Sequence, residues 1–122
     1  VGRALIAFLS RDNYDQLLTD LLKDKDAAKF IGRRGEKLDS ILEEVRAKGY
    51  ASNDGEWIPG LRAIGTPIFN ERGEVEASLS MSFISQAVSL VDMLEKHLPR
   101  LLETAGKISS VLGFGGNIRT WR

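Results

Sequence analysis

Apolar residues in the first fifty positions recur at helical spacing. In "GRALIAFLS" they share one helical face, and Ser10 can both end this helix and cap the next one. Leucines between residues 17 and 22 predict a second short helix after Tyr14, whereas residues 23–35 lack a clean period and predict a loop or irregular connector. Residues 35–48 predict an amphipathic helix that Gly49 closes. The apolar positions behind these predictions are Ala4, Leu5, Phe8, Leu9, Leu17, Leu18, Leu21, Leu22, Leu38, Ile41, Leu42 and Val45.

After Gly49 the apolar residues recur at every second position, which is typical of strands. Residues 49–52 predict a short strand, and residues 61–69 predict a longer one. The turn "NERG" then leads into a returning strand over residues 74–83. The two faces of the returning strand differ in polarity. One carries Val75, Ala77, Leu79, Met81 and Phe83, and the other carries Glu74, Glu76, Ser78, Ser80 and Ser82.

From about residue 86 the helical spacing returns and continues to about residue 112. Pro99 interrupts this pattern, and because proline has no N–H to donate, we expect a kink or a new helix start near Leu98. The glycine-rich tail from Gly113 onward is expected to fray. Helices, an antiparallel meander and a long helix predict an α+β domain. The apolar positions of the last helix are Val91, Leu94, Leu98, Leu101, Ala105, Ile108 and Leu112.

The composition narrows the function classes. A chain of 122 residues suffices for one core, so residues 1–122 are expected to form a single domain. It has 17 basic and 17 acidic side chains, so it lacks the positive field that holds a phosphate backbone, and nucleic acid is not expected as a direct partner. No cysteine, membrane-length apolar run or leader pattern occurs, so we expect no membrane contact and a soluble, cytoplasmic protein. Because the chain opens on Val1, we expect a fragment of something longer.

No residue pattern predicts catalysis, a metal site or a cofactor. His97 is the sole histidine, and the sequence offers no nucleophile, base and orienting group that would work together. A metal site would have to combine His97 with carboxylates alone, so a plain helical histidine is the simpler interpretation. We therefore expect a binding protein rather than an enzyme.

The middle of the chain has the features of half a small-molecule pocket. The serine face between residues 74 and 83 has no lysine or arginine, and the partner strand offers the small residues Ala63, Gly65 and Pro67 at alternate positions. A concave surface of small residues with a few hydroxyls suits a small polar ligand. In the alternative interpretation the turns are only turns and the serines face water.

Three segments of the chain resemble the IclR family of bacterial transcriptional regulators. Residues 49–82, "GYASNDGEWIPGLRAIGTPIFNERGEVEASLSMS", resemble the signature region of its effector-binding domain. "GRALIAFLS" and "LPRLLETAGKISSVLG" resemble its central and closing helices. The resemblance implies a GAF-like, profilin-like fold in which an antiparallel sheet is flanked by helices and one sheet face holds the effector. It further implies a homodimer or homotetramer that binds operator DNA through an N-terminal winged helix-turn-helix. That part and the first strands of the sensing domain are expected to lie outside this sequence.

The resemblance also implies which residues bind the ligand. Two serine hydroxyls would donate to a carboxylate of the effector, Leu61 and Ala63 would form apolar walls, and Asn53 or Asp54 would accept from a ligand hydroxyl or a water. Some members that bind small oxoacids have a cysteine in place of Ala63 and an acid in place of Asn53, so the ligand's identity is not transferred. The expected effector is a carboxylic or aromatic acid, and no cofactor is expected. The implied ligand-binding residues are Val1, Asn53, Asp54, Leu61, Ala63, Ser80 and Ser82.

Three functions stay open at this point. The first is a regulatory domain in which effector binding changes the geometry of the oligomer and thereby DNA binding. The second is a GAF-like sensing module attached to another output domain. The third is a pure dimerisation module, which predicts a filled pocket and solvated Ser80 and Ser82.

Overall fold

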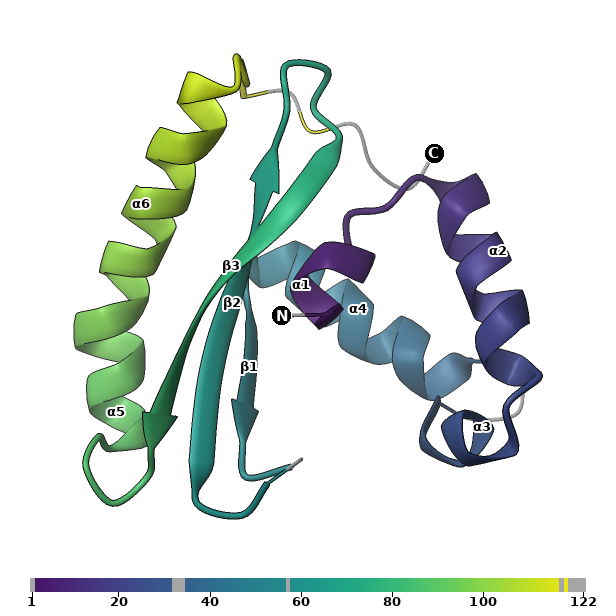
Figure 1. Ribbon diagram of the computed structural model, residues 1–122, viewed down its shortest axis with the longest axis horizontal. Helices are drawn as coiled ribbons and strands as arrows, with labels where there is room; N and C mark the ends of the chain where they lie inside the picture. Colours follow the sequence, from purple (N-terminus) through teal and green to yellow (C-terminus); the bar gives the residue numbers. More distant parts are fainter. Residues whose placement is uncertain (1, 32–34, 57, 117, 119–122) are drawn as a thin grey trace.

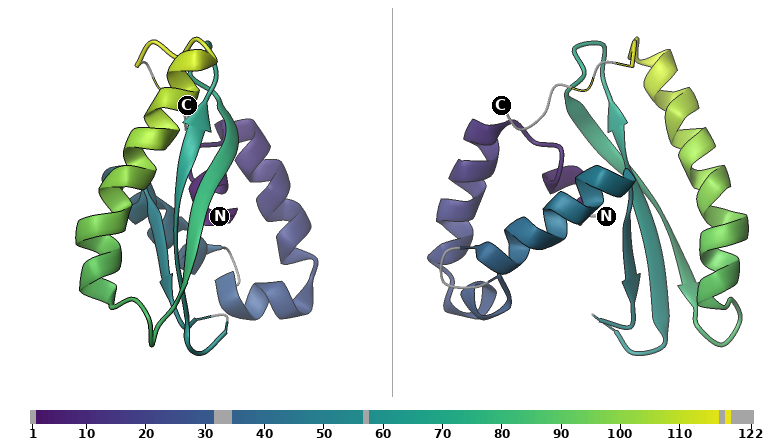
Figure 2. Two further views of the ribbon diagram at one scale, coloured as in Figure 1. Left: turned by 60° about the vertical axis from the view of Figure 1, so that its left-hand side comes forward. Right: turned by 180° about the vertical axis from the view of Figure 1, so that it is seen from behind.

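A three-stranded antiparallel sheet lies between two helical layers in the computed structural model, which describes residues 2–31, 35–56, 58–116 and 118 (Figure 1). The long C-terminal helix covers one face of the sheet, and the N-terminal helices lie on the other side, as Figure 1 and the right-hand view of Figure 2 show. This confirms the predicted α+β class. The elements are α1 (Gly2–Ile6), α2 (Arg11–Leu22), α3 (Lys25–Ile31), α4 (Glu36–Lys48), β1 (Ala51–Asp54), β2 (Leu61–Phe69), β3 (Val75–Ile84), α5 (Leu90–Asp92), the π-helical turn η1 (Met93–His97) and α6 (Leu98–Val111).

Local capping explains the N-terminal helices. The Ser10 side chain accepts the N–H of Asn13 and so caps α2, as predicted. The prediction of a connector over residues 23–35 was wrong for α3, because the Asp24 carboxylate accepts the N–H groups of Asp26 and Ala27 and starts a helix there. The sequence period missed this helix because it is only seven residues long. Helix α4 ends as predicted at Gly49, whose φ of 84° lies in the left-handed region.

The strands pair in the order β1-β2-β3. Strand β1 begins two residues later than predicted, since Gly49 and Tyr50 leave the helix and the first pair of the ladder is Ala51 with Gly65. A register shift at Ile68/Phe69 places Val75 opposite Phe69, so Val75 packs on the N-terminal side of the sheet rather than with Ala77. The prediction that Val75 shares the face of Ala77 was therefore wrong.

The C-terminal helix restarts before Pro99, as predicted. The N–H of Leu98 donates to the carbonyl of Met93, five residues earlier, and the regular helix α6 then begins with Pro99 in its first turn. The wider turn places Met93 and Leu98 on the same buried side and leaves Val91 59% exposed. The prediction that Val91 belongs to the apolar stripe was therefore wrong.

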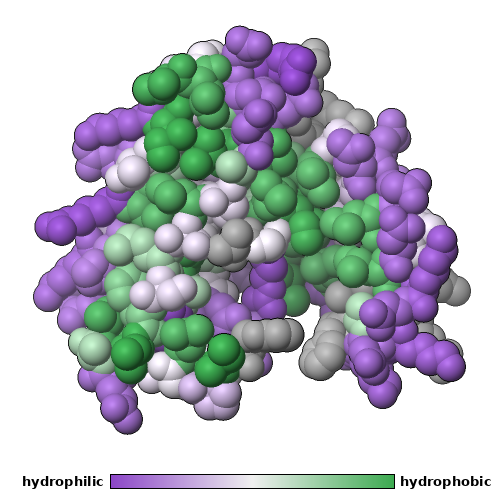
Figure 3. All heavy atoms as spheres, viewed as in Figure 1, coloured by the Kyte–Doolittle hydropathy of each residue, from purple (hydrophilic) through white to green (hydrophobic). Residues whose placement is uncertain are grey.

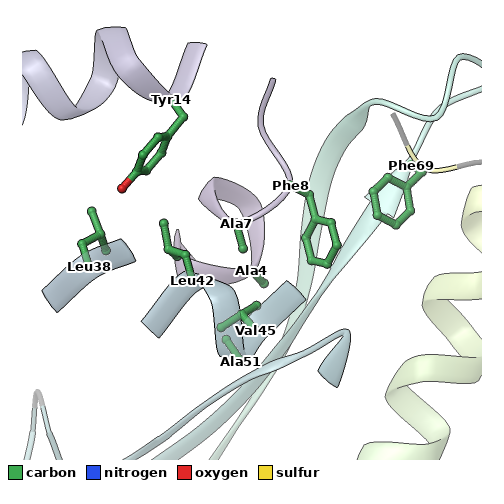
Figure 4. Packing of buried hydrophobic residues seen from close by; sticks show 9 residues of the cluster. All are labelled: Ala4, Ala7, Phe8, Tyr14, Leu38, Leu42, Val45, Ala51 and Phe69. Atoms are coloured by element: carbon green, nitrogen blue, oxygen red, sulfur yellow. The ribbon is translucent and has the colours of Figure 1, made fainter. Parts of the chain in front are cut away.

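Two hydrophobic clusters hold the layers together. The first joins α1, α2 and α4 to the sheet, with Phe8 edge-on to Phe69 at 5.4 Å between ring centroids (Figure 4). The second lies between the sheet and the C-terminal helix around Ile64, Met93, Leu98 and Leu101. The sheet is therefore packed on both faces at one end, whereas its other end, near the β1–β2 turn, is less covered on the N-terminal side (Figure 1).

Candidate ligand-binding site

A hollow of about 290 Å³ lies between the start of α1 and strands β1 and β2. A second hollow of about 210 Å³ lies beside it, between β1 and the C-terminal half of α4. The two share Arg3, Ala51 and Ser52, so they form adjoining parts of one recess. The space-filling view is hollowed between the sheet and the N-terminal helices in this region (Figure 3). The larger hollow is lined by Gly2, Arg3, Ala51, Ser52, Asn53, Ala63, Ile64 and Gly65.

The strand register explains why small residues gather there. Directly opposed residues of antiparallel strands project from the same face of the sheet. Asn53, Ala63 and Ser82 therefore form one row across the three strands. Ala51, Gly65 and Ser80 form the next row. Most of these side chains are short, which leaves space above the strands.

The structure places five predicted residues on this face, and four of them belong to the two rows just described. Asn53 and Ala63 line the larger hollow itself. Ser80 is half-buried and Ser82 is exposed, and neither lines the hollow, but each is the cross-strand partner of a lining residue. The two serines therefore extend the same surface toward the edge of the sheet formed by β3.

The other predicted residues lie outside these two rows. Leu61 pairs with Ile84 at the end of the sheet, on the same face as Ala63 but outside the lining. Asp54 projects from the opposite face, where its carboxylate is 2.8 Å from Nε of Arg62. Arg62 in turn donates to the backbone carbonyls of Ser85 and Val88. The Asp54–Arg62 pair thus ties the β1–β2 hairpin to the segment after β3. Val1 lies outside the described residues.

Four charged residues that line the described part of the recess were not predicted: Arg3, Glu44, Lys48 and Glu56. Arg3 lines both hollows, and Glu56 lines the smaller one. Their side chains form an ion pair, with Nη2 of Arg3 2.7 Å from Oε2 of Glu56. For Arg3 the sequence did contain a signal, because it is the single charged residue in the otherwise apolar stretch "VGRALIAFL". Glu56 had no such signal, because acidic residues are common in turns.

Hydrogen bonds order the rim of the recess. The side-chain oxygen of Asn53 accepts the N–H of Glu56 at 3.0 Å, which holds the start of the β1–β2 turn. At the smaller hollow, the hydrogen bond between Lys48 and Glu44 raises the pKa of Lys48 and lowers that of Glu44. Both groups are therefore charged at neutral pH. Within the described residues, no group of three or more His, Cys, Asp or Glu side chains is placed to hold a metal ion.

The comparisons with known proteins place this α+β domain among the C-terminal domains of bacterial transcriptional regulators. The chain belongs to the family described as "Bacterial transcriptional regulator IclR C-terminal", which matches residues 1–110. The resemblance predicted from the sequence is thereby confirmed. The chain is similar to the HTH-type transcriptional regulator KdgR of Escherichia coli K12, at 32% identity over 114 residues. That alignment covers 93% of this chain and 43% of KdgR.

Solved structures of related regulators show the same fold. The C-terminal domain of E. coli KdgR is 31% identical and has a TM-score of 0.75, with 93% of this chain and 68% of that chain covered. The Thermotoga maritima IclR is 29% identical and has a TM-score of 0.76, with 93% and 45% covered. These relatives are transcriptional regulators, which confirms the interpretation of a regulatory domain rather than an enzyme. Within the described part of the chain, no helix has both the length and the apolar character needed to cross a membrane.

Proposed function

We propose that the recess under α1 binds a small carboxylic or aromatic acid as the effector of an IclR-type regulator. The observation that carries this proposal is the hollow of about 290 Å³, lined by small residues, with one guanidinium at its edge. Its size is near the lower end of the range for small-molecule sites. Shape and charge together therefore favour a compact ligand with one anionic group.

The described residues on this sheet face have separate proposed roles. Ala63 and Gly65 form the floor, and Leu61 extends the apolar wall toward the hairpin turn. Ser80 and Ser82 donate their hydroxyls to the polar end of a ligand that reaches β3. Asn53 contributes polar atoms at the rim, although its side-chain oxygen already accepts one N–H. Asp54 is proposed only as a support of the hairpin, since its carboxylate pairs with Arg62 on the other face.

The proposed mechanism is a shift between arrangements of an oligomer. A ligand that binds one arrangement better than another increases the population of the first. In a homodimer or homotetramer this shift changes the spacing of N-terminal winged helix-turn-helix domains and so the affinity for operator DNA. We propose that residues 1–122 form a single effector-binding domain of such a protein, whose first strands and DNA-binding domain precede this segment. A protein that acts on bacterial DNA works in the cytoplasm, and we propose that location.

Native mass spectrometry of the full-length regulator tests this proposal. The protein is sprayed alone and with a panel of aliphatic and aromatic carboxylic acids, each paired with its neutral amide. We expect a mass shift of one ligand per subunit for at least one acid, on a dimer or tetramer. A protein that assembles but retains none of the acids would instead be a pure assembly module, which would contradict the proposal.

A further inference from the structure

The ion pair between Arg3 and Glu56 joins two segments that lie 53 residues apart in the chain. Arg3 belongs to α1, and Glu56 belongs to the turn between β1 and β2. The backbone N–H of Glu56 is bound by the Asn53 side chain, so this glutamate is anchored in the turn. The pair therefore ties the turn to the helix that roofs the recess.

The charges around the recess are unevenly divided between its two parts. Arg3 is the one charged residue among the described residues that line the larger hollow. Lys48, Glu44 and Glu56 line the smaller hollow, where Lys48 is paired with Glu44. An anion that enters the larger hollow would therefore meet a guanidinium whose carboxylate partner lies on the other side of it.

The ion pair is weak enough for a ligand carboxylate to replace the carboxylate of Glu56 on Arg3. The Arg3 and Glu56 side chains are 35% and 53% exposed, and solvent screens an ion pair of this kind so that it contributes little. A guanidinium has five N–H donors in a planar fork, of which the recorded contact with Glu56 uses one nitrogen, Nη2. A ligand carboxylate can form two parallel hydrogen bonds with such a fork. A ligand in the larger hollow would also contact its floor, and Glu56 is not among the described residues that line this hollow.

We propose that Arg3 is the residue that selects acids, and that the carboxylate of the effector takes the place of Glu56 on its guanidinium. The exchange releases the β1–β2 turn from α1 and so converts ligand binding into a movement of the hairpin. This inference rests on the proposed effector-binding function and adds the recognition residue and the moving part. Arg3 contacts the ligand, whereas Glu56 competes with it.

Calorimetric titration tests the proposal with benzoate and its neutral isostere benzamide, and with lactate and lactamide. The proteins are the wild type, Arg3→Gln, Glu56→Gln and the control Lys107→Gln, whose lysine pairs with Glu103 on α6. We expect the wild type and the control to prefer an acid over its amide about tenfold or more, because a charged hydrogen bond is lost with the amide. Arg3→Gln should bind acid and amide alike, and Glu56→Gln should bind the acid more tightly than the wild type.

Hydrogen exchange gives a second readout that does not depend on affinity. Benzoate or lactate, whichever binds, should speed amide exchange in residues 53–60 of the wild type, and Glu56→Gln should show this faster exchange without ligand. A wild type that binds none of the four probes would contradict the effector-binding proposal. If the wild type binds an acid and Arg3→Gln keeps the same preference over the amide, only the role of Arg3 is contradicted. Circular dichroism of each variant establishes that it is folded.

Discussion

Individual side chains on the α1-facing side of the sheet determine the space available to a ligand. Ala63 and Gly65 are small and so leave space above the strands. Ser80, opposite Gly65, is half-buried beside the hollow. Alternation along the strands predicted this face correctly. It also explains why Asn53 and Asp54 could not both belong to it, because neighbouring residues of a strand project from opposite faces. Asp54 consequently pairs with Arg62.

Replacement of Ser80 by leucine tests whether this surface binds ligand. The larger side chain should fill the space beside Gly65, so the rise in Tm produced by an acid that binds the wild type should disappear while the fold is retained. A ligand stabilises a protein only through its binding to the native state. Thermal denaturation with and without the acid measures the effect. Ser40→Leu, on an exposed position of α4, is the matched control, and an unchanged Tm rise in Ser80→Leu would contradict the site.

Tyr14 is a buried tyrosine that contributes to stability rather than to the recess. Its phenol donates a hydrogen bond to the Asp39 carboxylate, and the residue is only 3% exposed. Burial, followed by this hydrogen bond to a carboxylate, raises the pKa of Tyr14 well above its usual value near 10. The unfolded chain therefore loses this proton first, so the stabilisation is complete below about pH 10 and declines as the pH rises further.

The change Tyr14→Phe should lower the free energy of unfolding by about 1 to 3 kcal/mol at pH 8, since it removes a hydrogen bond to a charged group. Urea denaturation of both proteins at pH 8 and pH 11 measures the difference. We expect the difference to become smaller at pH 11, because only the wild type loses the contribution of the phenol there. An equal difference at both pH values would show that Tyr14 does not titrate as described.

Helices and strands followed the sequence wherever local signals were strong. The cap at Ser10, the end of α4 at Gly49 and the restart near Pro99 all depend on groups within one turn of the chain. Among the predictions that failed, two have causes that are hard to see in the sequence. Helix α3 depends on a cap by Asp24 in a short, weakly periodic stretch, and Val75 depends on a register shift relative to β2. A shift of register has no signature in one strand alone, because it is a property of the pair.

Two glycines should respond in opposite ways to replacement by alanine. At Gly49 the backbone has a positive φ, so Gly49→Ala should cost about 1 kcal/mol even though no atom lies within 4 Å of the new Cβ. Gly106 lies within α6, also with nothing within 4 Å, so Gly106→Ala should stabilise by up to about 1 kcal/mol. Urea denaturation measures both changes. Two changes of the same sign would contradict these conformations.

At the scale of the whole molecule, two hydrophobic clusters, one on each side of the sheet, hold the helices against the strands. Leu42 of α4 is fully buried in the cluster that joins the N-terminal helices to the strands. Met93 is fully buried in the cluster under the C-terminal helix. The recess lies at the border of the first cluster, since Ala51 and Val45 contribute both to the cluster and to the lining of the hollows. Stability and the shape of the candidate site are therefore coupled there.

Leu42→Ala should lower the free energy of unfolding by about 2 to 5 kcal/mol, through lost apolar burial and the cavity left behind. The matched control is Val111→Ala, since that side chain is 86% exposed and its truncation should change stability by less than about 0.5 kcal/mol. Chemical denaturation monitored by circular dichroism measures both. A loss at Leu42 no larger than that at Val111 would show that α4 does not pack on the core through this residue.

The sequence by itself determined the α+β class, most elements and the small, hydroxyl-bearing face of the strands, because periodicity and caps act between residues close together in the chain. Only the tertiary structure decided where the recess lies and which charges meet in it. Arg3 and Glu56 are 53 positions apart, and nothing in the sequence around either residue indicates that the two meet. Their contact exists because α1 packs against strands that come later in the sequence. Such a contact depends on how the fold brings distant segments together, which the spacing of residues within one segment does not reveal.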